Sequence, residues 1–130
     1  MIVIDASALV HVLVRDERAE PLQRRLRGEG RLNAPHLIDV EVLSALRRSL
    51  RLGLISVAHA ESARRELSRL RLVKHGHETV LARAWQLHDD LSAYDAVYVA
   101  LAERLRAPLV TSDARLARAP GLRTKVEVYE

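Results

Sequence analysis

Four carboxylates interrupt segments of this chain that are otherwise apolar. Asp5 and Asp113 each follow a short apolar run, Asp95 opens a long apolar segment, and Glu41 lies within an apolar helical pattern. Four acids brought together repel one another strongly, and divalent cations are the ordinary way to neutralise such a cluster. Oxygen ligands favour magnesium or manganese, which act on phosphate groups by activating water and stabilising the leaving oxygen. The acids therefore predict metal-assisted phosphate chemistry, provided that the fold brings them together.

Three of these acids also have a purely structural explanation. Asp5, or Ser7 two residues later, can cap the helix that follows, because Asp and Ser are both favourable N-caps. Ser92 and Asp95 fit a capping box, in which the two residues satisfy the backbone at a helix start. Glu41 can reach water or an arginine from the edge of an apolar stripe. Capping and chemistry are compatible, because a carboxylate in a first helical turn is held near the positive end of the helix dipole.

The elements that must position these acids follow from the apolar pattern. Residues 2–4 form a continuous rather than alternating apolar run, which is typical of a strand buried on both faces of a parallel sheet. A central strand is expected, and ligands bind outside the carboxyl ends of such strands. Asp113 follows a second predicted strand over residues 108–111. In a parallel sheet with right-handed crossovers, both strand-end acids lie at the same edge, where helix ends can bring Glu41 and Asp95.

The remaining pattern predicts a mixed succession of helices and short strands. Glu41 is expected on the apolar side of its helix, away from Arg47, Arg48 and Arg51. Trp85 is expected to pack in the core. The predicted helices cover residues 8–14, 20–28, 37–52, 56–70, 78–88, 91–103 and 114–119, and the predicted strands 2–4, 32–34, 70–74, 108–111 and 125–129, the last at a sheet edge.

Composition limits the classes of protein that remain. We expect a single domain spanning residues 1–130, because 130 residues with 48% hydrophobic content fill one core. The absence of cysteine excludes disulfides, zinc–thiolate sites and thiol nucleophiles. No run of eighteen apolar residues and no signal-peptide pattern is present, so we expect a soluble cytoplasmic protein without membrane contacts. A net charge of +4, supplied by arginine, is compatible with nucleic-acid binding.

Four sequence blocks, in this order, resemble the PIN-domain family and in particular the VapC-type toxins of bacterial toxin–antitoxin pairs. Together they span nearly the whole chain, and four blocks in order are far more specific than any one. The blocks are Val3-Ile-Asp-Ala-Ser-Ala-Leu9, His36-Leu-Ile-Asp-Val-Glu-Val42, Tyr94-Asp-Ala-Val-Tyr-Val-Ala-Leu-Ala102 and Leu109-Val-Thr-Ser-Asp113.

This resemblance implies an α/β/α sandwich with a five-stranded parallel sheet and a Mg²⁺- or Mn²⁺-dependent endoribonuclease activity. It implies Asp5, Glu41, Asp95 and Asp113 as the catalytic and metal-binding acids. Ser7 and Thr111 match accessory hydroxyl positions that orient acids or water. Some relatives carry a further acid two residues after the last aspartate, whereas this chain has Arg115. That arginine either favours one metal ion over two or lies beside the cleaved phosphate.

Three other functions are alternatives to the endoribonuclease hypothesis. A catalytically silent PIN-like module would bind RNA or protein through the same fold, but the presence of all four acids argues against it. A phosphoacceptor receiver domain would need paired acids after the first strand and a lysine at a late strand end, which Lys74 and Lys125 do not supply. A structure-selective DNA nuclease of related fold would carry large additional segments for gripping duplex, and this compact chain has none.

The resemblance also implies partners besides RNA. A cognate VapB-type antitoxin is expected to place an arginine among the four acids and a helix in an apolar groove. A homodimer is expected, and a heterotetramer or larger assembly with the antitoxin, because the apolar faces of the two central helices exceed what one small sheet covers. The groove is predicted to be lined by Leu37, Val40, Leu43, Val57 and Ala60.

Overall fold

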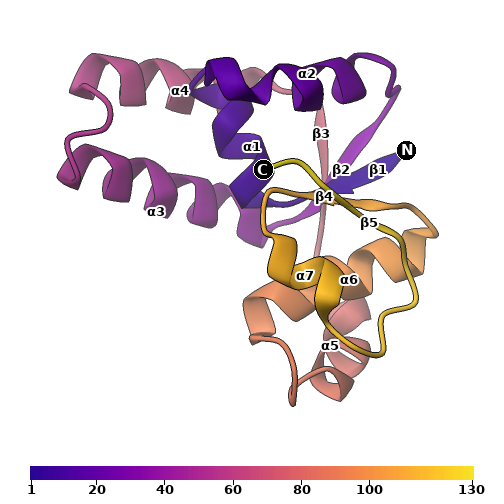
Figure 1. Ribbon diagram of the computed structural model, residues 1–130. Helices are drawn as coiled ribbons and strands as arrows, with labels where there is room; N and C mark the ends of the chain where they lie inside the picture. The colour runs from indigo at the N-terminus through magenta and orange to yellow at the C-terminus, as the bar shows by residue number, and fades with distance from the viewer.

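Strand β1 (Ile2–Ile4) lies at the centre of the sheet (Figure 1). The computed structural model describes all residues from 1 to 130. It contains a five-stranded sheet of order β3-β2-β1-β4-β5, and every neighbouring pair of strands is parallel. All three residues of β1 are fully buried. The continuous apolar run therefore predicted this strand and its central place correctly, and β5 is an edge strand, as expected.

The other elements follow the predicted order with shifted ends. The remaining strands are β2 (Leu32–Pro35), β3 (Leu72–His75), β4 (Leu109–Thr111) and β5 (Val126–Val128). The helices are α1 (Ala6–Leu13), α2 (Glu20–Arg27), α3 (Leu37–Arg51), α4 (Val57–Arg69), α5 (Leu81–Gln86), α6 (Ala93–Leu105) and α7 (Ala114–Arg118). None of these helices combines the length and the apolar composition that a membrane crossing needs.

Helices cover both faces of the sheet, so the predicted α/β/α sandwich is confirmed. Helices α1 and α2 lie on one side of the strands, and α5 and α6 lie on the other (Figure 1). Helix α6 is the central helix of its layer. Its residues 96–102 are all buried, and it contacts β1, β2 and β4. A helix that is apolar nearly all round was expected to be buried, and burial of this helix fixes the position of Asp95 in its first turn.

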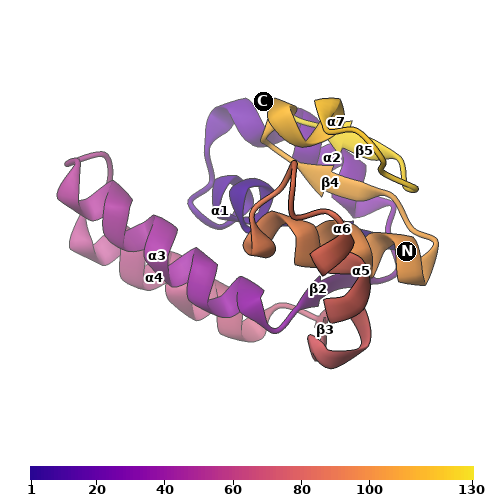
Figure 2. The same cartoon turned by 90° about the horizontal axis from the view of Figure 1, so that it is seen from below.

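Helices α3 and α4 form an arm that extends beyond the sheet (Figures 1 and 2). The turn between them contains Gly53 at φ +70°, a left-handed conformation that glycine adopts without strain. The arm carries a set of large apolar side chains that are exposed to solvent, unlike most apolar residues of the chain. They are Val40, Leu43, Leu52, Leu54 and Val57.

Side chains from distant segments fix the start of α3. Its first residue, Leu37, donates its backbone N–H to Nε2 of His77 at 3.1 Å, which satisfies one of the unpaired donors of the helix start. The other ring of this pair, His75, contacts Oδ1 of the buried Asn33 at 3.0 Å. No local sequence pattern indicates these contacts, because they depend on β2 and β3 lying side by side.

The expectation that Trp85 packs in the core is wrong. Its side chain is 71% exposed and stacks on the ring of His88, with ring centroids 4.5 Å apart. Helix α5 is only six residues long, and the buried residues along this segment are Val80, Ala84 and Leu87. This i, i+4, i+7 stripe turns the neighbouring Trp85 away from the core.

Arg25 on α2 ties this helix to the edge strand β5. Its guanidinium donates from Nε to Glu127 at 2.8 Å and from NH1 to Glu29 at 2.5 Å, and these contacts lower the pKa of both carboxyls. We expect Arg25→Ala to lower the free energy of unfolding by about 1–2 kcal/mol at neutral pH, because both acids are largely shielded from water. Urea unfolding measures this change.

The pH dependence of that loss has a definite sign. A carboxyl whose pKa is lowered by folding stabilises the fold above its unfolded pKa of about 4.3 and loses this contribution as pH falls. The penalty of Arg25→Ala should therefore shrink in acid. Arg24→Ala is the matched control, because the exposed Arg24 contacts only the half-exposed Glu20 on the same helix and should cost less than about 0.5 kcal/mol. Equal penalties for the two variants would contradict this assignment.

Candidate active site

Asp5 lies directly after β1 and is held from three directions. Ser7 Oγ donates to Asp5 Oδ1 at 2.7 Å, the backbone N–H of Ala8 donates to the same oxygen at 3.0 Å, and Thr111 donates from its hydroxyl to Oδ2. The residue is 6% exposed and is also the N-cap of α1. The capping and the functional explanations therefore both apply. A carboxylate held in this way has one orientation.

A hydroxyl network joins the ends of β1 and β4. Ser7 Oγ lies 3.2 Å from Thr111 Oγ1 and accepts the backbone N–H of Ser112 at 3.0 Å. Thr111 Oγ1 in turn accepts the backbone N–H of Asp113 at 3.0 Å. The two residues predicted as accessory hydroxyls thus contact Asp5 directly and connect it to the strand end that carries Asp113.

The four predicted acids lie close enough for their charges to act on one another. Burial raises the pKa of Asp5, and the charge of Asp95 raises it further. Burial also raises the pKa of Glu41, with Asp95 and Asp5 adding to the shift. The pKa of Asp95 is raised by burial and then by Asp113. Asp5, Glu41 and Asp95 therefore hold their negative charge at a cost that a cation would reduce.

Asp113 differs from the other three acids because Arg115 neutralises it. The guanidinium donates from Nε to Oδ1 at 3.0 Å and from NH2 to Oδ2 at 2.7 Å, and this ion pair holds the pKa of Asp113 below its usual range. Asp113 is also the N-cap of α7. Arg115 thus occupies both oxygens of the Asp113 carboxylate.

Glu41 carries an unsatisfied acceptor inside the site. Its Oε1 is buried without a hydrogen-bond partner, and so is the nearby hydroxyl of Tyr98, whose pKa is raised by burial and by Glu41. A buried oxygen without a partner costs free energy unless water, a proton or a cation satisfies it. The Tyr98 hydroxyl is the donor near Glu41, and it offsets part of the increase in the pKa of that acid.

The donor set suits a hard cation, although the side chains are not arranged as a finished cage. No three Asp, Glu or His side chains stand close enough together to hold a metal ion as they are. Asp5 is turned toward Ser7 and Thr111, and Asp113 is turned toward Arg115. Carboxylates with an orphaned oxygen among them match the oxygen preference of Mg²⁺ and Mn²⁺, and Mg²⁺ commonly uses only one or two protein carboxylates with several waters.

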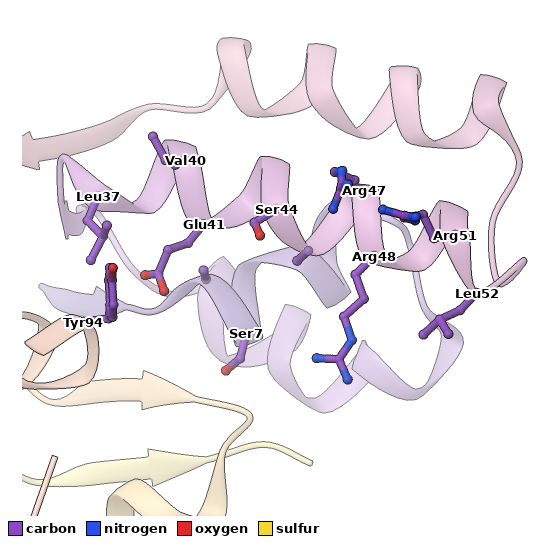
Figure 3. A pocket seen from close by; sticks show the side chains of 12 residues that line it. Ser7, Leu37, Val40, Glu41, Ser44, Arg47, Arg48, Arg51, Leu52 and Tyr94 are labelled. Carbon is purple, nitrogen blue, oxygen red and sulfur yellow. The ribbon is translucent and has the colours of Figure 1, made fainter. Parts of the chain in front are cut away.

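A groove of about 750 Å³ runs along α3 from Glu41, and Figure 3 shows the side chains that line it. Glu41 shares this groove with Arg47, Arg48 and Arg51, which corrects the expectation that the acid and the arginines lie on different sides of the helix. Seven residues separate Glu41 from Arg48, which is almost two full turns, so the two side chains lie nearly in line.

The predicted antitoxin groove is not a single groove in this structure. Leu37 and Val40 line the groove that contains Glu41. Leu43 lies instead in a separate hollow between α3 and α4, because it is turned roughly 120° around the helix from Leu37. Val57 is 75% exposed at the start of α4, whereas Ala60 is buried and cannot line an open surface. The prediction that these five residues line one groove is therefore wrong.

Comparisons with known proteins agree with the geometry. A model of the PIN domain family matches residues 2–122. Ribonuclease VapC3 of Mycobacterium tuberculosis is 43% identical over 119 residues, which cover 91% of this chain and 86% of that protein. The chain is a VapC-type member of the PIN domain family.

Solved structures place this PIN domain among the same folds. The crystal structure of PAE2754 from Pyrobaculum aerophilum superposes with a TM-score of 0.70 at 26% identity and covers 98% of this chain and 83% of that one. A toxin–antitoxin complex from Klebsiella pneumoniae has the same TM-score at 17% identity and covers 100% of this chain and 98% of that one, which shows the shared fold. The family expected from the four sequence blocks is thereby confirmed.

The sequence of this PIN domain did not predict two residues that lie near the acids. Tyr98 faces Glu41 from α6, and Tyr94 lines the groove with its side chain 61% exposed. The i, i+4 spacing of Tyr94 and Tyr98 could have predicted that both lie near Asp95, because residues three and four apart share a face of a helix. The segment is apolar nearly all round, so no polar face indicated this arrangement.

Proposed function

We propose that this protein is a divalent-metal-dependent endoribonuclease and the toxin of a VapBC-type toxin–antitoxin pair. The observation that carries the proposal is the convergence of Asp5, Glu41 and Asp95 from β1, α3 and α6, with the pKa of each raised by burial and by a neighbouring acid. The relatives named as VapC ribonucleases, at up to 43% identity, support RNA as the substrate class.

The residues themselves explain how the site would act. Asp5, Glu41 and Asp95 would hold Mg²⁺ or Mn²⁺, with Asp113 as a fourth ligand once it leaves Arg115. When bound, such an ion lowers the pKa of water and stabilises charge on the leaving oxygen of a phosphodiester. Ser7 and Thr111 keep the Asp5 carboxylate in one orientation. Arg115, released from Asp113, is free to bind a phosphate oxygen, because its guanidinium is 81% exposed.

The partner proteins belong to the same proposal. A cognate VapB-type antitoxin would insert an arginine among the acids, whose mutual repulsion a guanidinium relieves. The solved toxin–antitoxin complex with the same fold is compatible with such a partner. Leu43, Leu54 and Val57, the exposed apolar side chains of the α3–α4 arm that do not line the groove, would be covered in a homodimer or by the antitoxin, because exposed apolar side chains gathered in this way mark an interface.

Sequencing of RNA 5′ ends in cells tests the proposed function. Expression of the wild-type chain without antitoxin should create new RNA ends, and expression of Asp95→Asn should not. Asn keeps a side chain of the same shape at the start of α6, where Ser92 caps the helix through the backbone N–H of residue 95. New ends that appear equally with both chains would refute the enzyme and favour the binding module.

A further inference from the structure

The groove along α3 has an acidic end and a basic end. Glu41 and Ser7 line it beside the catalytic acids, and three arginines line it farther out, at positions 47, 48 and 51. Figure 3 shows Glu41, Ser44 and Arg48 following one another along one side of the helix. One continuous surface therefore connects the acidic site with a cluster of guanidinium groups.

The three arginines have no partner within the chain. None of them makes an ion pair or a side-chain hydrogen bond, although Arg24 and Arg64 on other helices each pair with a nearby glutamate. Arg47 and Arg51 are four residues apart and Arg48 and Arg51 three apart, so they repel one another on one helix face, by roughly 0.2–0.5 kcal/mol per pair. A cluster that costs stability and contains no counter-charge suits an external anion.

The distances along the helix suit a chain of phosphates. Arg48 lies seven residues beyond Glu41, roughly 10 Å along the axis, and Arg51 lies ten residues beyond it, roughly 15 Å. A nucleic-acid strand that leaves the acidic site along α3 would pass Arg48 first and Arg51 next. Glu41 is the one carboxylate that lines the groove, and Leu37 and Tyr94 also line it.

We propose that this groove is the track for the RNA strand on one side of the cleaved bond, with Arg47, Arg48 and Arg51 contacting its phosphates. The proposal rests on the proposed function, because the strand must start at a phosphodiester held by the acids. It assigns single-stranded RNA and not the antitoxin to the groove, because repeated phosphates match three guanidiniums in a row. Glu41, which lines the groove, is close enough to Asp5 and Asp95 for their charges to raise its pKa.

The salt dependence of RNA binding tests the track. Binding of a short fluorescein-labelled oligouridylate is measured by anisotropy in the Asp95→Asn background, which prevents cleavage. Each phosphate contact on a single strand contributes about 0.7 to the slope of log affinity against log salt. The triple variant Arg47→Gln, Arg48→Gln, Arg51→Gln should lower the slope by about 2 and weaken binding roughly tenfold.

Two matched variants make the result specific. Replacement of the same three arginines by Lys should keep most of the slope, because counterion release depends on charge. The control removes three exposed, unpaired arginines elsewhere with the same change in net charge, and it should leave the slope unchanged. That control consists of Arg65→Gln, Arg69→Gln and Arg71→Gln. Circular dichroism verifies that each variant is folded.

The outcomes separate the track from the proposed function. Wild type that cuts RNA, together with a groove variant whose affinity and slope equal those of the control variant, would overturn the track alone. A groove variant that binds RNA normally but escapes inhibition by the antitoxin would assign the groove to the antitoxin and would also overturn the track. A wild-type chain that neither binds nor cuts any RNA would overturn the proposed function itself.

Discussion

Asp5→Asn should reduce RNA cleavage on the order of a hundredfold or more and leave the fold intact. A bound ion supplies several kcal/mol of transition-state stabilisation, and each 1.36 kcal/mol is a factor of ten in rate. Asn retains the side-chain oxygen that accepts from Ser7 and Ala8, and it is as good an N-cap as Asp. Single-turnover cleavage of a defined RNA by the purified variant measures the loss.

Stability separates this effect from unfolding. The pKa of Asp5 is raised by burial, so the ionised carboxylate opposes folding at neutral pH, and a neutral Asn should leave the melting temperature unchanged or raise it. Asp39→Asn is the matched control on α3, because Asp39 pairs with Lys74 at the surface and does not line the groove. Wild-type cleavage rates in Asp5→Asn, or equal losses in both variants, would exclude Asp5 from the site.

Removal of divalent ions should abolish cleavage, and added Mg²⁺ or Mn²⁺ should restore it. The pKa values of Asp5, Glu41 and Asp95 are raised, so protons compete with the ion from a pH above the ordinary carboxyl range of about 4. The Mg²⁺ concentration that gives half-maximal cleavage should therefore rise as pH falls. Cleavage assays at several pH values, each with a Mg²⁺ titration, measure this shift.

Arg115 provides a second control on the same ion. It competes with a cation for Asp113, so Arg115→Gln should lower the Mg²⁺ requirement if Asp113 is a ligand. The pKa of Asp113 is lowered in the wild-type chain, so Asp113 should not contribute to the rise in the Mg²⁺ requirement as pH falls. Full activity in the presence of excess chelator would contradict a metal-dependent site.

The sheet and the location of the acids were predictable because they depend on local patterns. The apolar run of β1 has no polar face, so it had to lie inside the sheet, and the acid that ends it had to lie at the sheet edge. Gly53 follows α3 for an equally local reason, since its positive φ suits glycine. These features need no knowledge of the tertiary contacts.

The wrong predictions concern which side of a helix faces the core and which distant segments contact one another. The side of α3 that carries Glu41 was assigned from its apolar neighbours, yet the 3.6-residue period places Glu41 and Arg48 on one face. Trp85 was assigned by residue type, although the short α5 buries another face. The support of Leu37 by His77 depends on a contact between segments forty residues apart, which no local pattern contains.

The origin of the oxygen in the cleaved phosphate tests the central claim, that carboxylates in this site promote attack of water on RNA. Purified protein cuts a defined RNA with Mg²⁺ in ¹⁸O-labelled water, and mass spectrometry analyses the new ends. Water attack forms a bond from the water oxygen to phosphorus and breaks one bond from phosphorus to a ribose oxygen. We expect a linear 5′-phosphate that contains one ¹⁸O atom, because the bond from phosphorus to the ribose 3′ oxygen breaks. A 2′,3′-cyclic phosphate without ¹⁸O would contradict it, because the attacking group would then be the ribose hydroxyl.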